Sequence, residues 1–152
     1  MPITEKQLNI LVVDDEAGTR KALEAVLKLA GHQTAFAEDG DEALEVFDSA
    51  LDPFDLIITD HMMVRVSGLD LVRQLRERGF AGDIMVLTAY AGKIEEQEYR
   101  KLEVAGIMGK PFHIDEMRML LNCIYKSREE ARALGKIKGP PSSISFCWLK
   151  HD

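Results

Sequence analysis

The sequence has few cysteines, no long apolar run and no excess of basic residues, and each shortage excludes a class of protein. Cys123 and Cys147 lie far apart and form no Cys-x-x-Cys or Cys/His ligand pattern, which suits a reducing cytoplasm. No stretch approaches the roughly 18 consecutive apolar residues of a membrane span, and the N-terminus has no secretory pattern. We therefore expect a cytoplasmic protein without membrane contact.

The charge balance argues against a free-standing nucleic-acid binder. Acidic residues outnumber basic ones, 26 against 19, and the formal net charge is -7. Binding to nucleic acid depends on Lys and Arg meeting phosphates, so we expect no direct contact with it. The 152 residues, of which 46% are hydrophobic and 30% charged, allow one globular domain and a short extension.

Short apolar runs alternate with helical patterns along the chain. Strands are expected at residues 8–13, 32–36, 56–59, 84–87 and 107–108, and helices at 17–30, 41–50, 67–78, 92–104 and 113–134. Five strand–helix alternations with short connections predict right-handed crossovers and one parallel sheet. The predicted fold class is α/β, a doubly wound five-stranded parallel sheet of the flavodoxin-like type with helices on both faces.

Residues 1–135 are expected to form this domain, and residues 136–152 a loosely ordered tail. The tail begins KIKGPPSS, and its Gly and Pro residues prevent a helix there. The apolar residues 146–149 leave open a second interpretation, in which the tail docks on a partner. The segment after residue 125 is too short for a separate helix-turn-helix domain, so no DNA-binding domain is expected.

Charged and hydroxyl side chains gather where the predicted strands end. Asp14 and Asp15 follow the first strand, Asp60 the third, Thr88 the fourth and Lys110 the fifth. Ligands of open α/β sheets bind outside the carboxyl ends of the strands, so one common site is expected. Clustered carboxylates repel one another unless a hard cation joins them, and an all-oxygen set favours Mg²⁺ over Zn²⁺. One carboxylate would then be free to act as a nucleophile in phosphoryl transfer.

Two other phosphate-handling sites fit these residues less well. A dinucleotide or flavin site requires a Gly-rich or Ser/Thr-rich turn after the first strand, and residues 14–18 read DDEAG instead. A phosphatase of the haloacid-dehalogenase type requires a second Asp two residues after its nucleophile. That position is Met62.

Five short motifs within residues 8–125 together resemble the receiver-domain family of two-component signalling. They are VVDDE at 12–16, IITD at 57–60, Gly68, LTAY at 87–90 and GKPF at 109–112. Each is weak alone, but their order and spacing make the resemblance specific. The family's fold is the doubly wound sheet predicted above.

The resemblance implies a role for each residue of the site. Asp60 resembles the phosphoacceptor. The implied Mg²⁺ ligands are Asp14, Asp15, Asp60 and the backbone carbonyl of Met62. Thr88 resembles the switch hydroxyl that moves toward the new phosphate, and Lys110 the amine that bonds to it.

The resemblance also implies partners. A receiver accepts its phosphoryl group from a histidine kinase or a histidine phosphotransfer protein, acts on a downstream protein target, can dimerise on phosphorylation, and is not an enzyme. Residues 88–90 and 110–117 are especially similar to single-domain sporulation-phosphorelay regulators. The alternative is a pseudo-receiver that serves as an interaction module without phosphorylation. The intact set of five site residues favours the first interpretation.

Three residues depart from the family pattern. Val64 replaces a proline, so the loop after the acceptor is expected to be more mobile. Ile107 stands where many members have an aromatic ring that swings between states, so activation cannot use a Tyr ring there. His113 replaces an Asp and removes one N-cap of the last helix.

Side chains near the acceptor lead to further expectations. His61 is expected to point to solvent rather than to act in acid–base catalysis. Met63 is expected to lie inward and Met62 partly over the site. Met62 and Tyr90 flank the approach of water to the phosphoryl group, and neither has a carboxylate or amide to orient that water. Slow self-dephosphorylation is therefore expected.

Overall fold

The computed structural model describes residues 7–89, 96–135 and 147–149, and the predicted strands and helices are present among them. In chain order the elements are β1 (Asn9–Val13), α1 (Ala17–Leu29), β2 (Gln33–Ala37), α2 (Gly40–Ser49), β3 (Leu56–Asp60), α3 (Gly68–Glu77), β4 (Asp83–Thr88), α4 (Glu96–Lys101), β5 (Gly106–Gly109), α5 (Ile114–Ala133) and β6 (Cys147–Leu149). Within the described residues, no helix is long and apolar enough to cross a membrane.

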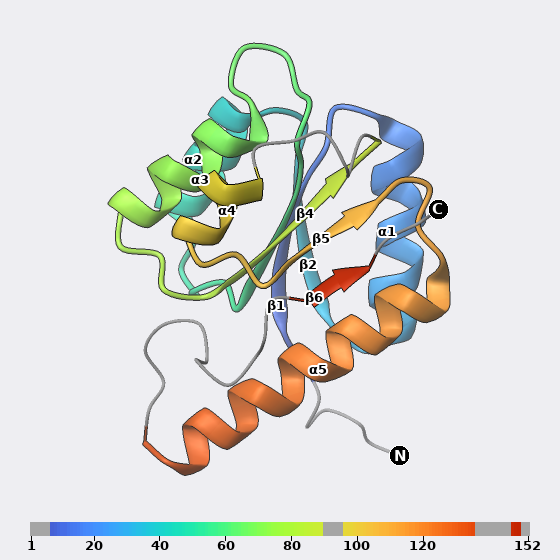
Figure 1. Ribbon diagram of the computed structural model, residues 1–152, viewed down its shortest axis with the longest axis vertical. Helices are drawn as coiled ribbons and strands as arrows, with labels where there is room; N and C mark the ends of the chain where they lie inside the picture. The colour runs from blue at the N-terminus through green and yellow to red at the C-terminus, as the bar shows by residue number, and fades with distance from the viewer. Residues whose placement is uncertain (1–6, 90–95, 136–146, 150–152) are drawn as a thin grey trace.

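All strand pairs of the sheet are parallel, in the order β2-β1-β3-β4-β5-β6. Helices α1 and α5 cover one face, and α2, α3 and α4 cover the other (Figure 1). The predicted doubly wound α/β fold is confirmed. The strand order reverses beside β1, so the carboxyl ends of β1 and β3 form the crevice where such sheets bind ligands.

The short strand β6 was not predicted. It pairs with β5 over three residues, from Gly106 opposite Cys147 to Met108 opposite Leu149. A three-residue strand after a segment rich in Gly and Pro is too short to give a periodic pattern. The pairing supplies partners for backbone groups on the outer edge of β5. The rest of the tail, residues 136–146 and 150–152, lies outside the described residues.

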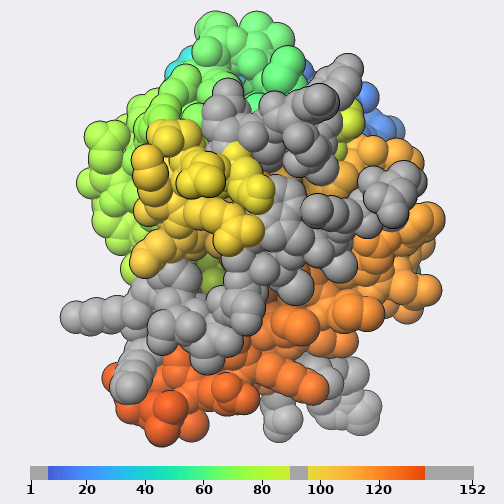
Figure 2. All heavy atoms as spheres, viewed as in Figure 1, coloured from blue at the N-terminus to red at the C-terminus, as the bar shows by residue number. Residues whose placement is uncertain are grey.

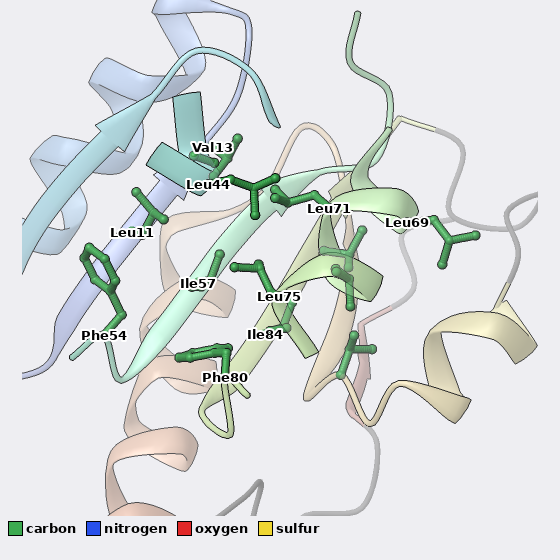
Figure 3. Close-up of a cluster of buried hydrophobic side chains, with 14 of the residues drawn as sticks. Leu11, Val13, Leu44, Phe54, Ile57, Leu69, Leu71, Leu75, Phe80 and Ile84 are labelled. Carbon is green, nitrogen blue, oxygen red and sulfur yellow. The ribbon is translucent and has the colours of Figure 1, made fainter. Parts of the chain in front are cut away.

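The core consists of two apolar layers, one on each face of the sheet. In the layer under α2, α3 and α4, Leu11, Ile57 and Ile84 of the strands meet Leu71 and Leu75 of α3 (Figure 3). The second layer joins the opposite face to α1 and α5. The central strands are buried on both faces, as their almost continuous apolar sequences predicted.

Helix ends agree with the sequence except at α4. The Ser67 hydroxyl accepts a hydrogen bond from the backbone N–H of Asp70 at 3.2 Å, which caps α3. His113 begins α5 without a side-chain cap, as expected. The helix predicted to reach Val104 ends at Lys101, because Glu103 adopts a positive φ of 57°. Residues 92–95 of that prediction lie outside the described residues.

Candidate functional site

The carboxyl ends of four neighbouring strands bring the predicted site residues to one edge of the sheet. Asp60 is the last residue of β3 and pairs with Leu87, so Thr88 lies one position further along the adjacent strand β4. Thr88 pairs with Gly109, and Lys110 follows directly. The backbone N–H of Lys110 donates to the carbonyl of Thr88 at 2.7 Å. Register alone therefore places the carboxylate of Asp60, the hydroxyl of Thr88 and the amine of Lys110 at the ends of three adjacent strands.

Four carboxylates gather at this edge. One oxygen from each of Asp14, Asp15, Glu16 and Asp60 lies within 4.8 Å of the others. Asp14 and Asp60 are buried, whereas Asp15 and Glu16 are exposed. The cluster contains the three predicted carboxylate ligands and also Glu16, which was not among the predicted ligands.

Asp14 is held in place by hydrogen bonds to both of its carboxylate oxygens. Its Oδ1 accepts the backbone N–H of Glu16 at 2.9 Å, and its Oδ2 lies 2.8 Å from Nζ of Lys110. Its backbone carbonyl accepts a 2.6 Å hydrogen bond from the guanidinium of Arg20 on α1. A nearly fully buried carboxylate is thus compensated by hydrogen bonds and one opposite charge.

Lys110 links the acidic residues. Its Nζ lies 3.3 Å from Oδ2 of Asp60 and 3.5 Å from Oε1 of Glu16, in addition to the bond to Asp14. Burial opposes the charge of the amine, but the hydrogen bonds and negative charges of Asp14 and Asp60 outweigh it and raise the pKa of Lys110. The amine is therefore a stable cation beside Asp60.

The ionised form of the Asp60 carboxyl group is destabilised. Burial and then the negative charge of Asp14 raise the pKa of Asp60 to about 6, against the opposing effects of Lys110 and of the backbone of Met62. A positive charge added to this cluster would favour the ionised form, which is the nucleophilic one.

The two methionines after the acceptor behave differently. Met63 packs against the apolar layer under α2 and α3, as expected. The Met62 side chain is 61% exposed. A hydrogen bond from the backbone of Met62 lowers the pKa of the Asp60 carboxyl group, and the role of the Met62 carbonyl as a metal ligand stays a prediction. Tyr90, expected to flank the site with Met62, lies outside the described residues.

The prediction for His61 is wrong. Its side chain is only 9% exposed, and its Nδ1 lies 2.6 Å from the hydroxyl of Tyr99 on α4. The side chain is held inward by this contact with Tyr99 and by the edge-to-face packing of the two rings. The backbone of His61 is also fixed, since its N–H donates to the carbonyl of Leu87 and its carbonyl accepts from the N–H of Gly68.

Close packing at Gly68 sets the position of this backbone. A Cβ at Gly68 would overlap the carbonyl oxygen of Asp60 and would lie 2.8 Å from Cα of His61. Only glycine allows the first turn of α3 to approach the end of β3 this closely. Gly68 therefore contributes to the site because it has no side chain to push α3 away from Asp60.

The donor set fits a magnesium ion. All candidate side-chain ligands are carboxylate oxygens, and no His or Cys belongs to the cluster among the described residues. Hard oxygen ligands of this number suit Mg²⁺, and a thiolate or imidazole set would suit Zn²⁺.

Comparisons with known proteins agree with this geometry. A family model described as the response regulator receiver domain matches residues 10–122. The response regulator MprA of Mycolicibacterium vanbaalenii is 36% identical over 119 residues, which are 78% of this chain and 51% of that protein. The chain thus spans about half the length of the curated relatives it matches.

Solved structures give the same result. The response regulator TrrA of Thermotoga maritima, in complex with Mg²⁺–BeF, superimposes with a TM-score of 0.69 and 32% identity, over 77% of this chain and 98% of that one. A receiver domain protein from Clostridium thermocellum gives a TM-score of 0.74 at 22% identity, over 81% and 98% of the two chains, and supports the fold.

Proposed function

This chain belongs to the response regulator receiver domain family, and we propose that it accepts a phosphoryl group on Asp60 in two-component or phosphorelay signalling. The observation that carries the assignment of Asp60 is the position of Lys110, whose Nζ lies within 3.3 Å of both Asp60 and Asp14. Asp60 is the member of the carboxylate cluster at the end of a central strand, with β1 and β4 on either side. A pseudo-receiver, which binds partners without being phosphorylated, would not require a lysine amine placed between Asp14 and Asp60.

The proposed reaction is an in-line transfer from a phosphohistidine. A carboxylate oxygen of Asp60 attacks phosphorus, the P–N bond breaks, and the imidazole leaves with the bonding electrons and takes up a proton. Lys110 would exchange its bond to the free carboxylate for one to a phosphoryl oxygen, and the hydroxyl of Thr88 would donate to another. No large movement of Lys110 is needed, because its amine already lies at the acceptor.

We propose Mg²⁺ as the cofactor, held by Asp14, Asp15, Asp60 and the backbone carbonyl of Met62. When bound, it would offset the repulsion between the carboxylates and the incoming phosphoryl group. The complex of TrrA with Mg²⁺–BeF supports this assignment by likeness. Exposed Glu16 belongs to the same cluster, and its place one residue after Asp15 suits a contact through water.

A groove beside the site suits the phosphoryl donor. It has a volume of about 770 Å³ and lies between α1 and the start of α5, with Lys110 in its lining. The part on α1 contains the small residues Gly18, Ala22 and Ala25, which allow another helix to approach closely. We propose that a helix of the histidine kinase or phosphotransfer protein occupies it, since the donor histidine must reach Asp60.

Output is proposed to pass through protein contacts, with dimerisation on phosphorylation as one form of it. The net charge of -7 argues against direct contact with nucleic acid. The free thiol of Cys123 is compatible with the proposed cytoplasmic location. Receiver domains are signalling modules, and we assign this chain no enzymatic activity on other substrates.

Intact-mass spectrometry tests the proposed function directly. Incubation with Mg²⁺ and acetyl phosphate is expected to add one phosphoryl group to the wild type and none to Asp60→Asn. Equal yield in Asp60→Asn, or no adduct in the wild type, would reject the assignment.

The donor groove needs a separate test. Ala22→Trp should slow transfer from a phosphorylated histidine phosphotransfer protein but not from acetyl phosphate. Ala50→Trp, at an exposed position after α2, is the matched control. Equal transfer to both variants would leave the groove without a role.

A further inference from the structure

His61 and Tyr99 form a buried polar contact that the phosphoryl site does not use. His61 directly follows the acceptor, and Tyr99 is the fully buried residue of α4. Nδ1 of His61 lies 2.6 Å from the Tyr99 hydroxyl, and the rings meet edge to face with centroids 5.6 Å apart. A hydrogen bond this short between buried groups has a defined geometry and is costly to leave unsatisfied.

The backbone of His61 connects three elements at the acceptor. Its N–H donates to the carbonyl of Leu87 on β4 at 2.9 Å, and its carbonyl accepts from the N–H of Gly68 at the start of α3 at 2.8 Å. The residue directly after Asp60 is therefore hydrogen-bonded to both β4 and α3 through its backbone. The side chain of that residue ends on α4.

Helix α4 presents its outer face to solvent. In the space-filling view it lies beside α3, with the start of α5 across the surface from it (Figure 2). Arg100 and Lys101 are exposed there, while Tyr99 points inward. Arg73 of α3 bonds to Glu98 at 3.1 Å, so the outer rim of α4 is held by exposed ion pairs. Exposed ion pairs of this kind contribute little to stability. The buried hydrogen bond between His61 and Tyr99 therefore has more influence than these pairs on the position of α4.

Strand β5 has no side chain at Ile107 that could connect the site to the surface by a hydrogen bond. Ile107 is buried and has no polar side-chain atom, so it cannot form or break a hydrogen bond when the site changes.

We propose that the His61–Tyr99 hydrogen bond transmits the phosphorylation state of Asp60 to helix α4. The inference rests on the proposed function, because it requires a phosphoryl group on Asp60. That group stands one residue from His61, and its bonds to Lys110 and Thr88 change the position of the backbone after β3. When His61 moves, its hydrogen bond to Tyr99 carries α4 with it. If the bond breaks instead, α4 loses that buried contact and is free to shift. His61 and Tyr99 are thus positioning residues that touch no reacting atom.

Hydrogen–deuterium exchange of α4 tests the proposal, with intact mass recorded on every sample. The wild type is expected to change its α4 exchange several-fold on treatment with acetyl phosphate and Mg²⁺. Tyr99→Phe keeps the ring and loses only the hydroxyl, so it should take up phosphate equally and lose most of that change. Tyr125→Phe on α5, where Tyr125 packs against the other apolar layer, is the matched control and should behave as the wild type.

A second pair of variants separates coupling from packing. His61→Asn places an amide near the position of Nδ1 and should retain the change in α4, whereas His61→Leu fills the space without a hydrogen bond and should lose it. A phosphorylated Tyr99→Phe or His61→Leu protein with the full change would overturn the inference alone. A phosphorylated wild type whose α4 does not change would do the same. A wild type that takes no phosphoryl group would reject the proposed function, and the inference with it.

Discussion

The guanidinium of Arg128 lies 3.6 Å from the carboxylate of Asp83, measured between Nη1 and Oδ2, at the edge of the sheet opposite the carboxylate cluster. Arg128 belongs to α5, and Asp83 is the first residue of β4. Asp83 is fully buried, and its carboxylate oxygens make no hydrogen bond among the described residues. Burial raises the pKa of Asp83 to about 6, against the opposing effect of Arg128.

The first prediction is that Asp83 makes the fold less stable as the pH rises. The folded state holds the Asp83 proton more tightly than the unfolded state, so its stabilising contribution is complete below the unfolded pKa near 3.8 and is lost through pH 6. Asp83→Asn should match the wild type near pH 4 and exceed it by up to about 3 kcal/mol at pH 7.5.

Urea denaturation across that pH range measures this difference. Asp52→Asn, at an exposed position, serves as the control for the loss of one negative charge. A constant difference between Asp83→Asn and the wild type from pH 4 to 7.5 would contradict the prediction.

A methyl group at Gly68 should damage both the fold and the site. Gly68→Ala forces the start of α3 away from Asp60 and His61, and overpacking of this kind costs about 1–3 kcal/mol. The yield of phosphoryl adduct at fixed time should fall as well. Gly18→Ala is the control, because a Cβ there meets no atom within 4 Å and alanine favours the helix. Equal melting temperatures of the two variants would refute the steric argument.

Magnesium should stabilise the folded protein. A ligand that binds only the native state contributes about 2.7 kcal/mol at a concentration 100 times its Kd. Thermal melts of the wild type should shift upward with Mg²⁺, and Asp15→Ala should show little shift. Asp41→Asn, an exposed carboxylate on α2, should retain the shift. If the wild type melts at one temperature at all Mg²⁺ concentrations, the donor set does not bind the ion.

The phosphoryl group on Asp60 should be long-lived. Met62 follows Asp60 by two residues and offers a flexible apolar side chain that orients no water. Met62→Asn supplies an amide for that purpose and should raise the hydrolysis rate on the order of 10-fold. Val64→Asn, at a similarly exposed position of the same loop, is the control. Loss of phosphate from the wild type within seconds, followed by mass spectrometry, would show that shielding is absent.

The fold and the common position of the five predicted site residues could be predicted because they depend on patterns that are local in the sequence. Buried parallel strands have nearly continuous apolar sequences, and the residue after each strand lies at the same edge of the sheet. Asp60, Thr88 and Lys110 could therefore be placed together from the chain order of the strands. Their proximity needs no side-chain detail beyond the register.

The features that sequence analysis missed depend on contacts between distant segments. Whether His61 points inward depends on Tyr99, 38 residues later, and a single tyrosine in a charged helix gives no periodic signal. The early end of α4 depends on the backbone of Glu103. The sequence places Glu16 with Asp14 and Asp15 at the end of the first strand but does not make it a ligand, and the structure brings its carboxylate within 4.8 Å of the other three.

Strand β6 has a consequence for self-association. With its three residues paired to β5, the hydrogen-bonding edge that would otherwise template another chain is occupied by the molecule's own C-terminal segment. A second molecule can gain that edge only by displacing β6. The outer strand offered to a second molecule is then the three-residue β6 rather than β5, and so short a strand is a poor template for pairing with another sheet.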